Sequence, residues 1–209
     1  MDGVIVDSNP MHREAWAAFN KRYGLETTEE MHQRMYGRRN VQIVRDFYGD
    51  DLAPEEVEAR GTAKVALYRE MMAEKLDQAL VPGLVEFLED YKNVPKALAT
   101  NAETENVQFL LERSGLRSYF GAVVDGRQVR NPKPHPEIYL RAADLLGFAP
   151  AECIVFEDSP TGVEAGLAAG MRVVGLLTTY VDLLGTSIAV HNFLSGELRT
   201  WLADQIEAA

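Results

Sequence analysis

The sequence has little sulfur and few basic residues, and each shortage excludes a class of protein. Cys153 is the one cysteine among 209 residues, so no disulfide can form within the chain. It opens the apolar run 153–156, which indicates a small buried hydrophobe rather than a reactive thiol. Lys and Arg number 21 against 32 Asp and Glu, which gives a formal charge of −11. Because such a surface repels nucleic acid and anionic membranes, we expect neither as a partner.

Long apolar runs are also missing. No stretch reaches the roughly 18 residues that a membrane span needs, and we expect no signal peptide, so a cytoplasmic location is the prediction. Hydrophobic residues make up 46% and charged residues 25%, as is typical of a globular protein. This length allows one substantial core and a small second unit. We expect a monomer or a weak homodimer.

The second half of the sequence alternates two kinds of segment. Short apolar segments, each followed by polar or turn residues, predict buried strands at residues 95–100, 122–125, 153–157 and 172–177. Amphipathic segments between them predict helices at residues 104–114, 136–146 and 161–169. This alternation favours right-handed βαβ units, and therefore an α/β fold with a doubly wound parallel sheet covered on both faces.

Residues 10–80 show helical periodicity alone. Apolar stripes at helical spacing predict helices at residues 11–23, 41–47 and 54–75. Pro82 and Gly83 then break the chain before the first α/β unit. We therefore predict an all-helical domain over residues 11–81, inserted into an α/β core made of residues 1–10 and 82–209.

Four groups of polar residues stand at the start of the chain or just after predicted strands. They are Asp2-Gly3, Thr100-Asn101, Lys133 and Glu157-Asp158. In an open parallel sheet, ligands bind beyond the carboxyl ends of the strands, so these groups are expected to converge.

Each group also has a purely structural interpretation. Asp2-Gly3 and Thr100-Asn101 are typical turn sequences, and Lys133 between two prolines suits a solvated loop. Ser159-Pro160 suits the first turn of a helix, with Ser159 as its cap. The joint order of the four groups favours a site.

This order and spacing resemble the haloacid dehalogenase-like superfamily, in its subgroup with a helical domain after the first motif. The first motif, Asp-x-Asp-Gly-(Val/Thr), survives as Met1-Asp2-Gly3-Val4. The second is Thr100, the third is Lys133, and the fourth lies in the family-specific run 155–165. The resemblance covers essentially the whole chain.

The resemblance implies Mg²⁺-dependent phosphoryl transfer through an aspartyl-phosphate intermediate. It implies that the backbone carbonyl of Asp2 and the carboxylates of Glu157 and Asp158 hold the ion, since oxygen ligands suit Mg²⁺. Lys133 would neutralise the phosphoryl oxygens, and Thr100 with amides near Asn101 would donate hydrogen bonds to them. Asp2 would also act as the general acid and base.

The family's attacking aspartate belongs directly before Met1, outside these 209 residues. We therefore expect the chain as given to be inactive, and its first strand to be short. A start site assigned to an internal methionine, or a shortened expression product, is favoured over a true pseudoenzyme.

Candidate substrate residues lie in the helical region, where the run 7–16 resembles β-phosphoglucomutases and sugar-phosphate phosphatases. His12 and Trp16 are four residues apart, on one helix face. Arg38 and Arg39 suit a second phosphate or a sugar, and Lys64 is a weaker candidate. The structural alternatives are a core role for Trp16, a solvated basic loop for the arginines, and a helix surface for Lys64.

The expected ligand is a small phosphorylated metabolite, with a sugar phosphate favoured. A phosphatase is favoured over a phosphomutase, and the third alternative is a non-catalytic protein that binds a phosphosugar or a metal. A dehalogenase is disfavoured, because Asp2 is the acid and base that phosphoryl transfer needs and dehalogenation does not.

Overall fold

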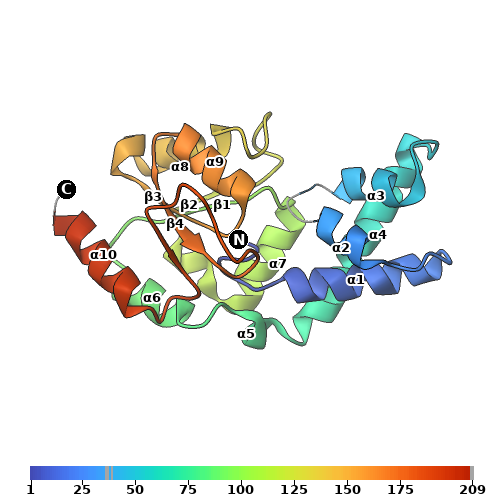
Figure 1. Ribbon diagram of the computed structural model, residues 1–209, viewed down its shortest axis with the longest axis horizontal. Coiled ribbons are helices and arrows are strands. Elements are labelled where there is room, and N and C mark those ends of the chain that lie inside the picture. Colours follow the sequence, from blue (N-terminus) through green and yellow to red (C-terminus); the bar gives the residue numbers. More distant parts are fainter. Residues whose placement is uncertain (36–37, 39, 208–209) are drawn as a thin grey trace. The chain divides into compact units, whose positions relative to one another are not determined.

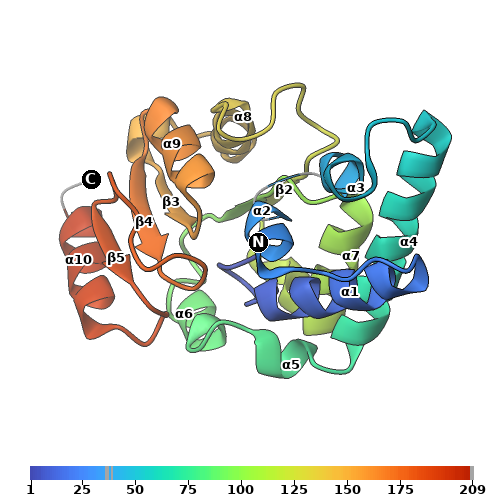
Figure 2. The ribbon, with the colours of Figure 1, turned by 45° about the vertical axis from the view of Figure 1, so that its right-hand side comes forward.

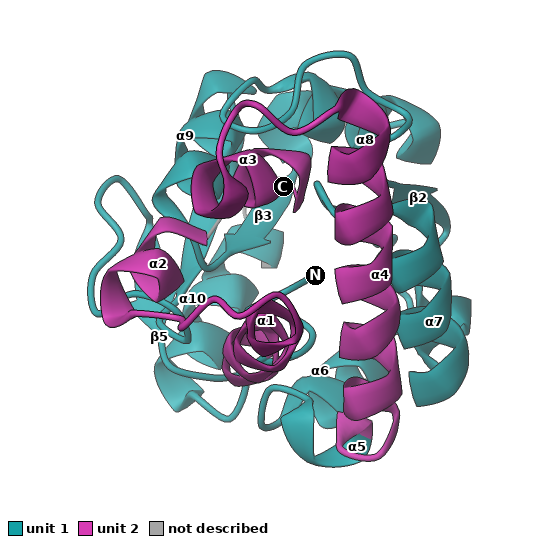
Figure 3. Cartoon of the chain, turned by 90° about the vertical axis from the view of Figure 1, so that its right-hand side faces the viewer, with its two compact units in different colours: residues 1–7, 77–209 teal, residues 8–76 magenta. Residues whose placement is uncertain are grey.

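A computed structural model describes residues 1–35, 38 and 40–207, and it divides the chain into two compact units (Figure 3). Residues 1–7 and 77 onward form the first unit, and residues 8–76 form the second. The predicted limits of the helical domain were residues 11 and 81. The second limit lies earlier because Leu80 bridges Val6, and the Val81 N–H donates to the Ile5 carbonyl at 3.0 Å.

The first unit contains parallel strands, which confirms the predicted α/β class. Its strands are β1 (Ala97–Ala99), β2 (Ala122–Val124), β3 (Ile154–Glu157), β4 (Arg172–Leu176) and β5 (Ile188–Val190). Their order is β1-β2 in one sheet and β3-β4-β5 in another, and every pairing is parallel (Figure 2). The described strands thus form two parallel sheets, where the sequence predicted one doubly wound sheet. Residues 1–6, which could have added a strand, instead fold into a turn in which the Gly3 N–H donates to the Val6 carbonyl at 2.7 Å.

Helices cover both faces of these strands. They are α6 (Leu84–Asp90), α7 (Thr104–Ser114), α8 (Glu137–Leu146), α9 (Pro160–Ala168) and α10 (Gly196–Glu207). Figure 1 shows α8 and α9 on one side of the strands, with α6 and α10 on the other.

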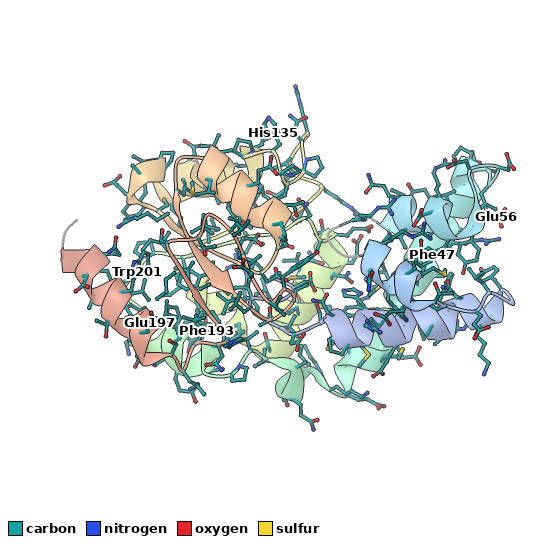
Figure 4. All side chains as sticks on the ribbon, in the orientation of Figure 1. Phe47, Glu56, His135, Phe193, Glu197 and Trp201 are labelled. Carbon is teal, nitrogen blue, oxygen red and sulfur yellow. The ribbon has the colours of Figure 1, made fainter. Side chains whose placement is uncertain are left out.

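Strand β3 shows how its alternating side chains supply both faces. Val155 belongs to the apolar cluster of Ile138 and Val163, from α8 and α9. Phe156 points the other way, toward Phe87 of α6 at 5.5 Å and Phe193, labelled in Figure 4, at 5.7 Å between ring centroids. Both faces of the strand are therefore covered by apolar side chains.

Helices are the only regular secondary structure among the described residues of the second unit. Its helices are α1 (Asn9–Arg22), α2 (Glu29–Met35), α3 (Asn40–Tyr48) and α4 (Pro54–Ala73); α5 (Leu76–Ala79) follows at its end. Three of these match predicted helices to within two residues, and α2 was not predicted. Trp16, Phe19, Val44 and Val57 are buried in one apolar cluster that Phe47 flanks.

No helix in the described part of the chain is long and apolar enough to cross a membrane.

The core of the first unit gives a stability prediction. Ile138 is fully buried in the cluster that Val124 and Val155 share, whereas Leu145 on the same helix is 54% exposed. Ile138→Ala should lower the free energy of unfolding by about 2–5 kcal/mol, because it leaves a cavity. Leu145→Ala should change it by less than about 0.5 kcal/mol. Urea unfolding measures both, and equal effects would contradict the packing described.

Candidate active site

Glu157 and Asp158 stand where β3 ends and α9 begins. Ser159 caps that helix: its side-chain oxygen accepts the Gly162 N–H at 3.2 Å, and Pro160 occupies the first turn. The predicted cap is thus confirmed, and it directs the two preceding carboxylates to the carboxyl end of the strands. Both are buried, with Glu157 4% and Asp158 9% exposed.

Both carboxylate oxygens of Glu157 accept hydrogen bonds. Oε1 accepts from Lys133 Nζ at 2.5 Å and from the buried hydroxyl of Tyr139. Oε2 accepts the Asp158 N–H at 3.1 Å and the Ser159 hydroxyl at 3.2 Å. Burial alone would raise the pKa of Glu157, but the charge and hydrogen bond of Lys133, with the bond from Tyr139, lower it to about 2.

Only glycine fits at position 162, beside this carboxylate. A Cβ there would lie 2.0 Å from the carboxyl carbon of Glu157. The missing side chain therefore lets the first turn of α9 approach Glu157 directly, with the favourable end of the helix dipole facing the negative charge.

Lys133 lies beside Glu157 in the same buried cluster. Its ammonium also donates to the Ala99 carbonyl at 3.3 Å and sits 4.6 Å from the centroid of the Tyr139 ring. Its side chain is 9% exposed, so the alternative of a solvated loop charge is wrong. Its backbone N–H donates to Asn101 Oδ1 at 3.3 Å, which joins the third predicted group to the second.

Thr100 and Asn101 follow β1. Thr100 is buried, its N–H donates to the Val124 carbonyl at 3.0 Å, and its hydroxyl oxygen accepts the Ala102 N–H at 3.1 Å. The predicted turn is therefore present. A hydroxyl that accepts through its oxygen can still donate its hydrogen, so Thr100 is able to bind an anion.

Asp158 lies against the turn of the first residues. Gly3 has a φ of +68°, a left-handed conformation, and a Cβ there would lie 1.9 Å from Asp158 Oδ2. The same oxygen accepts a hydrogen bond from the Thr179 hydroxyl, and the Thr178 hydroxyl donates to the Gly3 carbonyl at 2.5 Å. Burial, and then the charge of Glu157, raise the pKa of Asp158 to about 6.

Sequence reasoning missed Tyr139, Thr178 and Thr179. The two threonines follow β4, the parallel neighbour of β3, so the rule of strand carboxyl ends applied to them as well. Tyr139 gave no such signal, because its side chain reaches Glu157 from within α8 and an apolar helix face predicts only packing.

Asp2 and the backbone nitrogen of Met1 adjoin this cluster. Burial and the charge of Lys133 lower the pKa of the Met1 amino group, while the charges of Asp2, Glu157 and Asp158 raise it. The first residues therefore lie within electrostatic reach of both predicted carboxylates and of the ammonium.

The donor chemistry of this cluster fits a hard divalent cation. Among the described residues, no group of three or more His, Cys, Asp and Glu side chains is placed to hold a metal. The predicted set does not need one, because Asp2 would contribute a backbone carbonyl. The Lys133 ammonium pairs with Glu157, while burial and the charge of Glu157 raise the pKa of the adjacent Asp158. A cation beside Asp158 would balance its negative charge.

In the second unit, the structure brings together three of the predicted substrate residues. Lys64 is 1% exposed, so the alternative that it decorates a helix surface is wrong. Its Nζ lies 2.8 Å from His12 Nδ1 and 4.9 Å from the Trp16 ring centroid. His12 stacks on Tyr68, with ring centroids 4.0 Å apart and planes at 6°.

Trp16 also belongs to the apolar core of this unit, whereas Arg38 is a surface residue. Trp16 packs edge-on against Phe19 and Phe47, at 6.0 and 5.2 Å between centroids, as its core alternative predicts. Arg38 is exposed and pairs with Asp46 at 3.2 Å. Arg39 lies outside the described residues.

The comparisons with known proteins agree with this geometry. A family model described as haloacid dehalogenase-like hydrolase matches residues 1–170. The chain belongs to the haloacid dehalogenase-like hydrolases. A family IA, variant 3 hydrolase of the same superfamily from Entamoeba histolytica has the same fold, with a TM-score of 0.87, 26% identity, and coverage of 99% of this chain and 96% of that one.

Named relatives in this family act on sugar phosphates. A phosphorylated carbohydrates phosphatase of Thermotoga maritima is 34% identical over 189 residues, which cover 87% of this chain and 85% of the relative. A β-phosphoglucomutase of Bacillus subtilis is 27% identical over 181 residues, which cover 84% of this chain and 80% of the relative. The chain thus resembles the phosphatase and phosphoglucomutase branch of the haloacid dehalogenase-like hydrolases.

The pKa of Asp158 predicts how stability depends on pH. Because its folded pKa of about 6 exceeds the ordinary value of 3.8, the folded state binds more protons between these values. The contribution of Asp158 to the free energy of unfolding therefore falls as pH rises through that window. Relative to Asp158→Asn, the parent should lose on the order of 1–3 kcal/mol between pH 4 and 7. Denaturant unfolding in chelator measures this.

The exposed loop residue Asp182 provides the matched control. Asp182→Asn should follow the parent curve at every pH. Parallel curves for the parent and Asp158→Asn would show that Asp158 titrates as an ordinary carboxyl.

Proposed function

We propose that the protein is a Mg²⁺-dependent phosphatase that acts on a small sugar phosphate through an aspartyl-phosphate. The observation that carries this proposal is the buried cluster of Lys133, Glu157 and Asp158 against the Asp2–Gly3 turn. A phosphate ester carries negative charge and is a poor electrophile, so its cleavage depends on positioning and charge neutralisation. A buried ammonium and a cation-binding carboxylate meet both needs.

Lys133 and Thr100 bind the phosphoryl oxygens in this proposal. Glu157 and the Ala99 carbonyl hold the ammonium of Lys133 in one orientation, so that it meets the phosphate without losing further side-chain freedom. The Thr100 hydroxyl, with backbone amides near Asn101, donates hydrogen bonds to the remaining oxygens. These groups stabilise charge that develops as the ester bond breaks.

Asp158 and the backbone carbonyl of Asp2 would hold the Mg²⁺ ion, and Glu157 would complete the predicted set. Both oxygens of Glu157 already accept hydrogen bonds. The main contribution of Glu157 to cation binding is therefore the negative charge that it places next to Asp158. When bound, Mg²⁺ neutralises phosphoryl oxygens and orients the phosphate.

The attacking carboxylate stands directly before Met1 in this proposal. The nitrogen of Met1 is buried within reach of the charges of Lys133 and Asp158, so a residue joined there adds its side chain to the same cluster. Asp2 then protonates the departing oxygen of the substrate and afterwards takes a proton from the attacking water.

His12 and Lys64 recognise the sugar part of the substrate. If the Lys64 ammonium donates to His12 Nδ1, the imidazole carries its proton on Nε2 and offers it to a hydroxyl or phosphate oxygen. The Lys64 ammonium lies over the Trp16 ring. Arg38 and Arg39 are two further cationic candidates of this unit.

A phosphomutase is the second candidate, and the buried cation of Lys64 favours it. A mutase passes the phosphoryl group to a second hydroxyl of the sugar and must hold a doubly phosphorylated intermediate, which needs a second cationic group. The two activities differ in the acceptor, water or sugar hydroxyl, so product analysis with one sugar monophosphate separates them.

The missing carboxylate gives the sharpest test of the proposal. Residues 1–209 alone should hydrolyse sugar phosphates at no more than a thousandth of the rate of the same residues preceded by a strand-forming segment ending in Asp. The remaining groups stabilise a transition state that cannot form without a nucleophile. Phosphate release with Mg²⁺ measures both, and an extension ending in Asn is the control. Equal activity in the two polypeptides would show that the nucleophile lies elsewhere, and activity in neither would favour a non-catalytic binding protein.

The loss of activity on substituting Lys64 should depend on whether the substrate contains a sugar. In the aspartate-extended polypeptide, Lys64→Met should lower kcat/KM for a hexose phosphate by roughly 10–100-fold, because a charged hydrogen bond is lost. Hydrolysis of acetyl phosphate, which has no sugar, should change by less than threefold. Lys75→Met is the matched control, since Lys75 is exposed and pairs with Glu14 at 3.3 Å. Equal losses on both substrates would contradict a role in sugar recognition.

A further inference from the structure

Two consecutive threonines tie together the two segments that carry the proposed metal ligands. We propose that Thr178 and Thr179 form a positioning pair that sets the separation of Asp158 from the Asp2–Gly3 turn, and with it the affinity for the divalent cation. The inference rests on the proposed function, and it deepens it by assigning two further residues to the site.

Thr179 fixes the orientation of the Asp158 carboxylate. Its hydroxyl donates to Oδ2, and the Cα of Gly3 packs against the same oxygen. A carboxylate on a single Cβ can otherwise rotate about two side-chain bonds. With Oδ2 held from both sides, the other oxygen, Oδ1, is presented in one direction, as a metal ligand requires.

Thr178 fixes the other segment. Its hydroxyl donates to the Gly3 carbonyl at 2.5 Å, one peptide after the carbonyl of Asp2. Because Gly3 has no side chain and a left-handed φ of +68°, it imposes little steric resistance to rotation of the neighbouring peptide planes. The bond from Thr178 supplies the constraint that the glycine does not.

The sheet gives both threonines a rigid base. Glu157, the last residue of β3, pairs with Gly175 of β4, and the Leu177 N–H donates to the Val190 carbonyl at 2.9 Å. Thr178 and Thr179 follow immediately, so they are anchored to a strand that is paired on both sides. Further along this loop Val181 is 97% exposed, so the constraint is confined to the residues next to the sheet.

The metal affinity of the full chain tests the pair without any need for turnover. Mn²⁺ takes the same carboxylate and carbonyl ligands as Mg²⁺, and its paramagnetic resonance signal reports the free ion. Thr179→Val removes the hydroxyl but keeps the shape, and Thr179→Ser keeps the hydroxyl. Thr186→Val is the matched control, because the Thr186 hydroxyl of the same loop donates to the Leu183 carbonyl at 2.9 Å.

Thr179→Val should raise the Kd for Mn²⁺ by about tenfold, in line with other losses of groups that orient metal ligands. The Kd values of Thr179→Ser and Thr186→Val should stay within about twofold of the parent value. The Kd of Thr178→Val should lie between that of the parent and that of Thr179→Val. A Thr179→Val value within twofold of the parent would overturn the proposal, as would an equal loss in Thr186→Val. Should Thr179→Val fail to fold, Thr179→Ala is measured in its place against the same limits.

A double-mutant cycle separates this inference from the function on which it rests. If Thr179 acts through Asp158, then Thr179→Val should add no loss of Mn²⁺ affinity in the Asp158→Asn background. Additive losses would overturn the positioning role while leaving the metal site intact. If the parent and Asp158→Asn bind Mn²⁺ equally, the metal site itself is wrong, and the proposed function and this inference fall together.

Discussion

The ion pair of Lys133 and Glu157 is the interaction on which the site depends. Both side chains are nearly excluded from water, and a buried charge is tolerated only when it is paired and hydrogen-bonded. The pair draws its support from four places in the first unit: the end of β1, the loop before α8, the Tyr139 hydroxyl and the first turn of α9. Removing either partner would leave an uncompensated charge in the core. The same ion pair therefore serves both the stability of the fold and the proposed chemistry.

Much of this arrangement could be predicted from the sequence, because the patterns involved are local. The limits of β1 to β4 and of α7 to α9 follow from apolar periodicity to within two residues, whereas β5, α6 and α10 were not predicted. The cap at Ser159 follows from its residue type and the proline after it. The rule of strand carboxyl ends predicts that Lys133, Glu157 and Asp158 lie close together.

What the sequence could not provide is set by contacts between distant segments. Lys64 is a charged residue, which a helix usually exposes, and only its contacts with Trp16 and His12 determine its environment. Tyr139 acts through a single hydroxyl, for which neither periodicity nor spacing gives a signal. The division of the strands into two sheets likewise depends on how residues 1–6 fold, and a short Gly-containing segment permits both a turn and a strand.

The two units have separate apolar clusters that share no residue: one is built around Ile138 and Val155, the other around Trp16 and Val44. Substitutions at such independent sites tend to add rather than interact in their effect on stability. The helical unit can therefore accumulate changes in its interior while the packing beneath the buried charges stays as it is. Substitutions that change substrate preference can therefore arise in the helical unit with little effect on the stability of the unit that carries the buried charges.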